Sequence, residues 1–120
     1  MSLLYSGGSA NYIGVADIAA ATAWYIDKLG LRKVEAEPDD GKDCIALGFA
    51  HDDRAIYLGP LAHSSEEFTH MLNSSNLKKT REFLISRGVN VTEIQQDRQR
   101  THYFEMRDLE GNVIEICEEH

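Results

Sequence analysis

Residues 107–116 have the sequence Arg-Asp-Leu-Glu-Gly-Asn-Val-Ile-Glu-Ile, and this stretch decides the fold. Its polar, glycine-containing segment 108–112 predicts a turn, and the alternation that follows in 113–116 predicts a strand. In that strand Ile114 and Ile116 point to one face, while Glu115 points to the other. Another alternating stretch, residues 103–106, precedes the turn. The pattern therefore predicts two antiparallel strands joined by a turn.

The same order of elements occurs twice along the chain. Asp17 and Asn76 each precede a helical pattern, because their side chains accept hydrogen bonds from the free backbone amides at a helix start. Gly30 and Gly88 end these two patterns, as glycine commonly does just past a helix. The two caps are 59 positions apart and the two glycines 58 positions apart. This spacing predicts an internal repeat of the order strand, helix, strand, strand, strand.

Each half is expected to form a curved sheet with a helix on one face. In the first half we expect strands at 11–16, 34–37, 44–49 and 55–58, and a helix with Ile18, Ala21, Tyr25 and Leu29 on its apolar side. In the second half we expect strands at 68–72, 89–94, 103–106 and 113–116, and a helix with Leu77, Phe83 and Leu84 on its apolar side. Two such sheets side by side leave a cup, a concave face lined by alternate strand residues, which suits a small molecule.

The composition is that of one ordinary globular domain. The chain has 120 residues, of which 42% are hydrophobic and 27% charged, which excludes a disordered protein. Its 12 basic and 20 acidic residues give a net charge of −8, which disfavours nucleic acid and anionic membranes as partners. Its longest apolar run, residues 18–26, is too short to span a bilayer, and no export signal is recognisable. With only Cys44 and Cys117, we expect a cytoplasmic protein.

The sequence resembles the vicinal oxygen chelate superfamily, also called the glyoxalase / bleomycin resistance / dioxygenase superfamily. The resemblance is carried by residues 15–18, by Trp24-Tyr25, by residues 29–31 and by residues 107–116, where Leu109-Glu110 replaces the usual Pro-Asp. It implies an α+β fold of two tandem βαβββ modules that form a cupped mixed sheet with helices on the outer face. The whole chain, 1–120, is then one domain, with pseudo-repeats at about 10–59 and 67–118 and a flexible lead-in at 1–9. The resemblance also implies a homodimer.

The resemblance implies a metal held by four side chains, one from the first and one from the fourth strand of each half. Carried over one at a time, the four positions fall on Ala10, Tyr57, Thr69 and Glu115, and Glu115 alone is a common ligand of this family. His70 follows Thr69, and only a β-bulge or a shorter connection would turn it into the cup. The other histidines, His51, His63 and His102, match no ligand position. We therefore expect no metal cofactor; if a divalent metal is present, Glu115 and His70 would hold it.

Strand alternation predicts which side chains face the cup. The expected ligand-binding residues are Tyr12, Tyr57, Thr69, Met71, Asn73 and Glu115. Tyrosine rings with hydroxyl tips favour flat organic ligands, although the same rings would also serve to fill the cup or to form a dimer interface. Glu115 should be partly desolvated, which raises its pKa and suits proton transfer or the binding of a cation. Alternatively, its carboxylate reaches solvent or pairs with an arginine.

Three functions are compatible with this pattern. The first is a binding protein that captures a small aromatic or amphipathic organic molecule in the cup without a complete metal site. The alternative is a metal-dependent enzyme, either a lyase or isomerase of the glyoxalase type or an extradiol-type dioxygenase, with Glu115 as the catalytic residue and His70 as a further ligand. A structural or regulatory dimer with a filled cup is the third. A stoichiometric transition metal in the purified protein would separate the second from the first.

Overall fold

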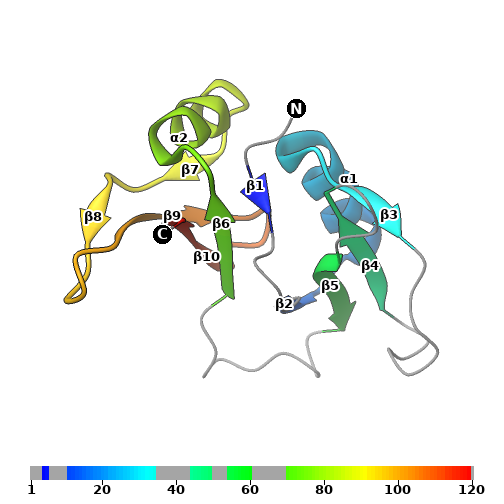
Figure 1. The fold of residues 1–120 in the computed structure, drawn as a ribbon. Helices are drawn as coiled ribbons and strands as arrows, with labels where there is room; N and C mark the ends of the chain where they lie inside the picture. Colours follow the sequence, from blue (N-terminus) through cyan, green and yellow to red (C-terminus); the bar gives the residue numbers. More distant parts are fainter. Residues whose placement is uncertain (1–3, 6–10, 35–43, 50–53, 61–69, 120) are drawn as a thin grey trace.

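Each half of the chain folds into a sheet with one helix packed on it in the computed structural model, which describes residues 4–5, 11–34, 44–49, 54–60 and 70–119 (Figure 1). The first half contributes β2 (Asn11–Val15), α1 (Ile18–Leu29), β3 (Arg32–Val34), β4 (Ile45–Gly48) and β5 (Arg54–Pro60). The second half contributes β6 (His70–Ser74), α2 (Leu77–Ser86), β7 (Asn90–Val91), β8 (Gln95–Gln96), β9 (His102–Arg107) and β10 (Val113–Glu118). A short β1 (Leu4–Tyr5) precedes both halves.

The two sheets have the same strand order. In the first, β2 pairs in parallel with β5, and β4 and β3 follow as antiparallel neighbours. In the second, β6 pairs in parallel with β10, and β9 and β7 follow in the same way. The identical strand order in the two sheets confirms the α+β fold of two tandem βαβββ modules that the repeat predicted.

Both helices begin and end where the sequence predicts. The Asp17 carboxylate accepts a 3.0 Å hydrogen bond from the amide of Ala20, and the Asn76 side chain accepts one of 3.1 Å from the amide of Lys79. Gly30 ends α1 in the left-handed conformation, and Gly88 follows α2 with a positive φ as well. These signals depend on neighbours a few residues away, so the sequence alone identifies them.

Three expectations differ from the structure. Leu4–Tyr5 belongs to the expected flexible lead-in, yet it pairs with Ser74 and Asn73 as β1, because Leu4 is buried in the core at 4% exposure. Phe83 is 39% exposed, since Thr80 takes the buried position on α2 and bonds to the Ser74 hydroxyl.

The expected strand 89–94 forms only the two-residue β7. The Thr92 hydroxyl accepts a hydrogen bond from the amide of Glu105 and interrupts the ladder, so the next pairing with β9 starts at Gln95. Residues 68–69 and 35–37 of the other expected strands lie outside the described residues.

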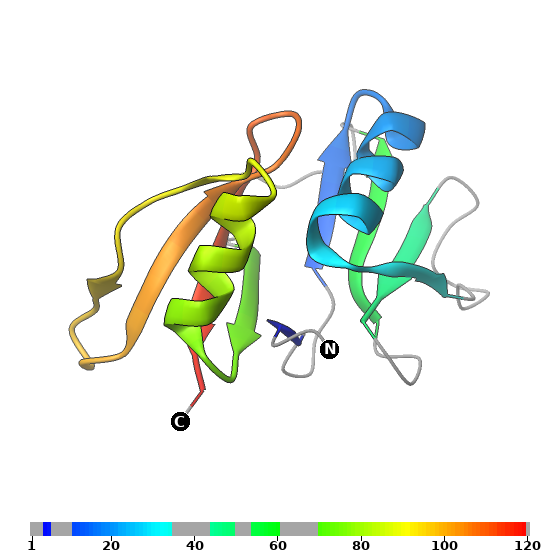
Figure 2. The same cartoon turned by 90° about the horizontal axis from the view of Figure 1, so that it is seen from above.

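The two sheets lie side by side with both helices on the same side of them, as Figure 2 shows. At the seam, the Asn11 side-chain amide donates to the carbonyl of Met71 at 2.7 Å and accepts from the amide of Met71 at 3.0 Å. The helix ends are also joined, because Lys28 donates to the carbonyl of Arg87 and Arg87 donates to the carbonyl of Asp27. The opposite side of both sheets, which carries neither helix, is called the helix-free face below.

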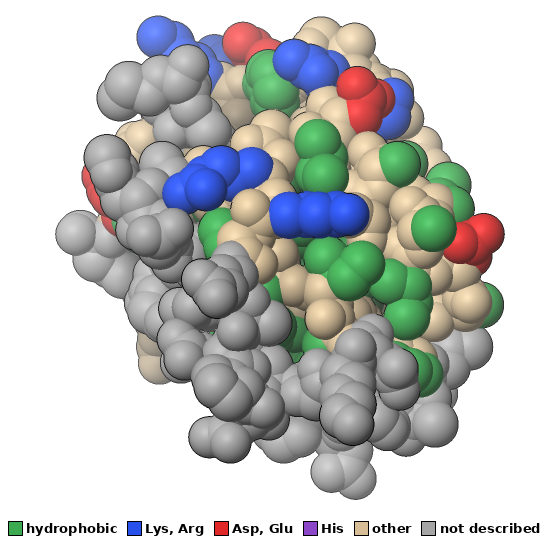
Figure 3. All heavy atoms as spheres, turned by 90° about the vertical axis from the view of Figure 1, so that its right-hand side faces the viewer, with side chains coloured by type: hydrophobic (Ala, Val, Ile, Leu, Met, Phe, Trp, Pro, Cys, Tyr) green, Lys and Arg blue, Asp and Glu red, His purple; other side chains and the backbone are tan. Residues whose placement is uncertain are grey.

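The outer edge of the first sheet is β3, whose Arg32 and Lys33 are exposed. Figure 3 shows this side of the molecule, where lysine and arginine side chains lie across a surface on which hydrophobic side chains also gather. Charged side chains on an edge strand hinder its pairing with a strand of another chain. Neither helix in the described ranges has the length and hydropathy that crossing a membrane requires.

Candidate functional site

The helix-free face of the second sheet is built by alternation in β10 and its neighbours. Ile114 and Ile116 are at most 1% exposed under α2, so Glu115 and Cys117 point to the other side. Met71 lies beside Glu115 and Asn73 beside Cys117 on the parallel strand β6. The structure thus brings three of the sequence-predicted residues, Met71, Asn73 and Glu115, onto one face.

Tyr12 and Tyr57 are direct neighbours on the helix-free face of the first sheet, on the paired strands β2 and β5. The Tyr12 hydroxyl accepts a hydrogen bond from the Cys44 thiol, with an Sγ to Oη distance of 3.4 Å. Gly59 leaves the room that this arrangement needs, because a Cβ atom there would overlap the Tyr12 hydroxyl. Strand register therefore places the two tyrosines side by side, and the space over Gly59 accommodates the Tyr12 hydroxyl.

His70 lies on the opposite face from Glu115. It shares the alternation of Leu72, which is fully buried on the helix side, and it pairs with Ile114 on β10. Burial lowers the pKa of His70, and the nearby Asp108 only partly offsets this effect. The register of β6 with β10 places His70 and Glu115 on opposite faces of the second sheet, so the two side chains named for a possible metal do not converge on one ion.

Glu115 faces another carboxylate across the strand pair. Its partner in register on β9 is Glu105, which points to the same face. Partial burial, followed by repulsion from Glu105 and Asp97, raises the pKa of Glu115. Neither carboxylate forms a hydrogen bond or ion pair with its side-chain oxygens among the described residues, so both remain able to accept from a ligand.

The donor set that the structure describes does not fit the metal site of this fold. Among the described residues, no group of three or more His, Cys, Asp or Glu side chains is placed to hold an ion. His102 hydrogen-bonds to Glu118 instead, at 3.0 Å. Ala10 and Thr69, together with His51 and His63, lie outside the described residues. Of the two described ligand positions, Glu115 supplies a carboxylate and Tyr57 a phenol, which is a poor ligand for a divalent ion.

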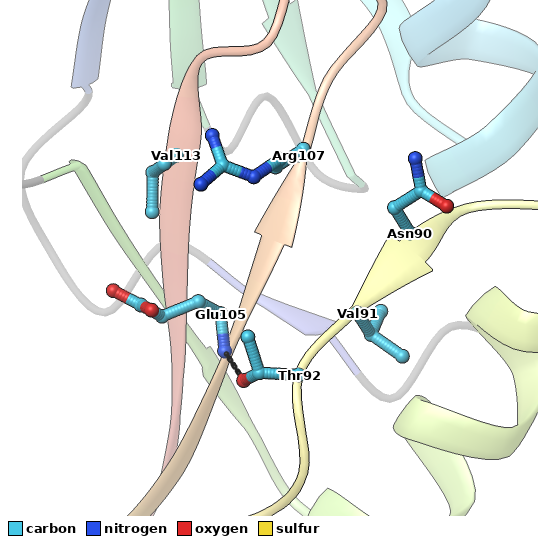
Figure 4. Close-up of a pocket in the computed structure, with 6 residues that line it drawn as sticks. All are labelled: Asn90, Val91, Thr92, Glu105, Arg107 and Val113. Atoms are coloured by element: carbon cyan, nitrogen blue, oxygen red, sulfur yellow. Dashed lines mark hydrogen bonds between the residues drawn. The ribbon is translucent and has the colours of Figure 1, made fainter.

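A small pocket lies at the β7, β9 and β10 corner of the second sheet, and sequence reasoning missed it (Figure 4). It has a volume of about 110 Å³ and is lined by Asn90, Val91, Thr92, Glu105, Arg107 and Val113. The alternation of 102–107 was sufficient to place Glu105 and Arg107 on the face of Glu115. The sequence did not predict that Asn90 and Thr92 line this pocket, because their position depends on the irregular end of β7.

The comparisons with known proteins agree on the fold. The sequence profile of the Glyoxalase/Bleomycin resistance protein/Dioxygenase superfamily matches residues 9–116. A member of this superfamily from Sphaerobacter thermophilus DSM 20745 has a similar structure, with a TM-score of 0.73 and 19% identity, over 93% of this chain and 98% of that one. None of the curated proteins matches the chain.

Two further solved structures resemble the chain at low identity. TnmS3, an antibiotic binding protein from Streptomyces sp. CB03234, is 16% identical with a TM-score of 0.72, over 94% of this chain and 97% of that one. A lactoylglutathione lyase from Agrobacterium tumefaciens is 16% identical with a TM-score of 0.66, over 94% and 93%. A binding protein and an enzyme are both similar to this chain. These similarities therefore establish the fold, and the activity has to be inferred from the residues of the site.

Proposed function

Because the chain belongs to the Glyoxalase/Bleomycin resistance protein/Dioxygenase superfamily, we propose that it binds a small aromatic or amphipathic organic molecule on its helix-free face, without a metal. The observation that carries this proposal is the neighbouring pair Tyr12 and Tyr57 on that face. Two adjacent aromatic side chains offer a flat ligand a surface on which its ring can stack.

The second sheet adds apolar and charged groups to this surface. Met71 stands at the seam beside the first sheet and is 43% exposed, which leaves an adaptable apolar side chain for a ligand to cover. Glu115, in register with Met71, supplies a carboxylate for a cationic or hydrogen-bond-donating part of the ligand. Asn73 and Thr69 complete the proposed binding set. The antibiotic-binding activity of TnmS3 supports this class of function and does not identify the ligand.

The enzymatic alternative, a lyase, isomerase or dioxygenase that uses Glu115 and His70, is not favoured by the described residues. It uses Glu115 with His70 as a possible further ligand, and these two side chains lie on opposite faces of the second sheet. Elemental analysis of the protein purified without chelator tests the metal-free part of the proposal. A stoichiometric zinc, iron or nickel ion would overturn it.

Binding of a planar cation tests the main proposal. 9-Aminoacridine is fluorescent and planar, and dicyclohexylamine is a cation without a flat ring. We expect 9-aminoacridine to bind and dicyclohexylamine to bind much more weakly. Tyr57→Ser should weaken 9-aminoacridine binding about tenfold, which corresponds to about 1.4 kcal/mol. Phe83→Ser is the matched control, because Phe83 is exposed on α2 away from the helix-free face. Equal binding of both amines, or equal effects of both variants, would contradict the proposal.

We further propose that the protein acts in the cytoplasm as a homodimer. Cys44 and Cys117 are both free thiols, which is compatible with a reducing compartment. A second copy would cover open sheet edges other than the charged β3. Sedimentation velocity at micromolar concentration tests the dimer, and a monomer under these conditions would contradict it.

A further inference from the structure

We propose that the pocket of Asn90, Val91, Thr92, Glu105, Arg107 and Val113 holds the polar end of the ligand, a group that carries a protonated amine beside a carboxylate or carbonyl oxygen. This inference rests on the proposed function, because it specifies one end of the molecule that the helix-free face binds. The pocket is separate from the tyrosine pair, which lies in the first sheet.

The pocket presents opposite charges that do not neutralise each other. Arg107 and Glu105 are two residues apart on β9, and Figure 4 shows both side chains pointing to the same side, toward β10, with Val113 beside Arg107. A strand rises about 3.3 Å per residue, so their Cα atoms are roughly 6.6 Å apart. No ion pair joins Arg107 to Glu105 among the described contacts. A ligand with a cation next to an acceptor oxygen can bridge this separation.

Both groups retain free hydrogen-bonding capacity. Arg107 donates from one nitrogen to the carbonyl of Gly111, at 3.3 Å, so the rest of its planar fork is available to an acceptor oxygen. The side-chain oxygens of Glu105 have no donor among the described residues. Glu115 lies directly opposite Glu105, and this second carboxylate makes the Glu105 side of the pocket attractive to a positive group.

The pocket is fixed in place by the backbone. Thr92 accepts from the amide of Glu105 through its hydroxyl and donates its own amide to the Glu105 carbonyl, at 2.9 and 2.8 Å. This double contact holds the strand segment that carries Glu105, so little ordering is required when a ligand binds. Val113, beside Arg107, adds an apolar side chain on this face, whereas Val91 is in register with the buried Met106 and packs against the core.

The size of the pocket indicates that it holds a head group. Its volume of about 110 Å³ is small, whereas pockets for drug-sized ligands are usually about 300–1,000 Å³. The rest of a larger ligand would extend over β10 toward Glu115 and Met71, which follow in register across the sheet. Free amino acids and the amino-acid-like end of a larger molecule share this chemistry.

Nuclear magnetic resonance of the full, ¹⁵N-labelled chain tests the inference with glycine, methylammonium and acetate. We expect glycine to shift the amides of Thr92, Glu105, Arg107 and Val113, and the two singly charged probes to bind more weakly. Arg107→Gln and Glu105→Gln should each reduce the affinity for glycine about tenfold. Lys78→Gln and Glu82→Gln are the matched charge controls, since both residues are exposed on α2. Equal affinity for all three probes, or no shifts at these amides, would overturn the inference.

A fourth probe separates the two sources of the head group. If the ligand is a larger molecule, 3-(2-naphthyl)alanine should bind more tightly than glycine and also shift the amide of Met71. If the ligand is a free amino acid, glycine should bind as well as the naphthyl compound; either outcome supports the pocket. Failure of the inference is distinguishable from failure of the proposed function. Without glycine shifts, 9-aminoacridine binding that Tyr57→Ser weakens would still support the proposed function.

Discussion

The hydroxyl of Tyr25 donates a 2.6 Å hydrogen bond to the carboxylate of Asp108, 83 positions further along the chain. Both groups are buried, and Asp108 also accepts from the backbone amides of Glu110 and Asn112. Burial, followed by the Asp108 carboxylate, raises the pKa of Tyr25 well above its usual range. The carboxylate of Glu110 in turn accepts from the amides of Ala16 and Asp17 at the start of α1. The turn of the second half therefore holds the helix of the first.

Tyr25→Phe should destabilise the protein by about 1.5–3 kcal/mol, because it removes a hydrogen bond to a buried charged group. Chemical denaturation at pH 7 measures this change. Tyr5→Phe is the control, since the hydroxyl of Tyr5 donates an equally short bond to Glu119 at the surface. Solvent replaces that bond, so its loss should have a much smaller effect. Equal losses in the two variants would show that burial at Asp108 does not strengthen the bond.

Gly111→Ala should cost about 1 kcal/mol, because Gly111 has a φ of 86° that a side chain adopts only with strain. A Cβ atom there would meet nothing within 4 Å, so the loss comes from the backbone alone. Gly111→Asn should cost less, since asparagine tolerates this region better than alanine does. Thermal denaturation of the two variants checks this order, and an alanine variant as stable as wild type would contradict it.

Asn112→Ala should also destabilise the turn, because it removes side-chain hydrogen bonds and not because of the backbone conformation at this position. Asn112 has no positive φ, so backbone tolerance does not explain its presence. Its side-chain amide donates to Asp108 at 2.9 Å and to the carbonyl of Gly14 at 3.5 Å. The expected loss is about 1 kcal/mol, as for an ordinary hydrogen bond. Asn112→Asp, which cannot donate from its side chain, should lose at least as much in the same thermal assay.

Gly59→Ala should displace the Tyr12 ring, because the new methyl group overlaps the Tyr12 hydroxyl and also lies 3.1 Å from the Cys44 sulfur, closer than ordinary van der Waals contact. We expect a loss of about 1–3 kcal/mol, typical of overpacking. A double-mutant cycle isolates the cause: in a Tyr12→Ala background the same substitution should have little effect. Additive effects would mean that Gly59 is needed for its backbone and not for the space it leaves.

Local signals allowed the sequence to predict much of this fold, and long-range contacts account for what it missed. The caps at Asp17 and Asn76 and the alternation around Glu115 depend on residues within a few positions, and they agree with the structure. The pairing of Leu4 with Ser74 joins residues 70 positions apart, and nothing near Leu4 in the sequence indicates it.

The candidate site was predictable only where it follows strand alternation. Tyr12, Tyr57, Met71, Asn73 and Glu115 are on the helix-free face for this reason. Glu105 and Arg107 follow the same rule on β9. The pocket that they line depends on where β7 ends beside β9, which the sequence does not indicate. The face to which the His70 side chain points depends on whether a β-bulge precedes it, and the sequence alone does not predict a bulge.

Glu115→Gln should stabilise the protein at pH 7 and have no such effect in acid. The pKa of Glu115 is raised in the folded state, so folding favours its protonated form. Its contribution to stability is therefore complete below the unfolded pKa of about 4.3, and is lost as the pH rises through the folded value. The carboxylate is partly exposed and lies opposite Glu105, so we expect a gain in stability at pH 7 of about 0.2–1 kcal/mol, as for removing a like-charge cross-strand pair.

Urea denaturation at pH 7 and below pH 4 measures the effect of Glu115→Gln on the free energy of unfolding in both conditions. Glu82→Gln, on the exposed side of α2, should show no pH-dependent gain. The same Glu115 variant should bind 9-aminoacridine less tightly than wild type, because it removes negative charge beside the proposed ligand. A variant less stable than wild type at pH 7 would show that the carboxylate has a stabilising partner, and a gain that persists in acid would show that charge is not its cause.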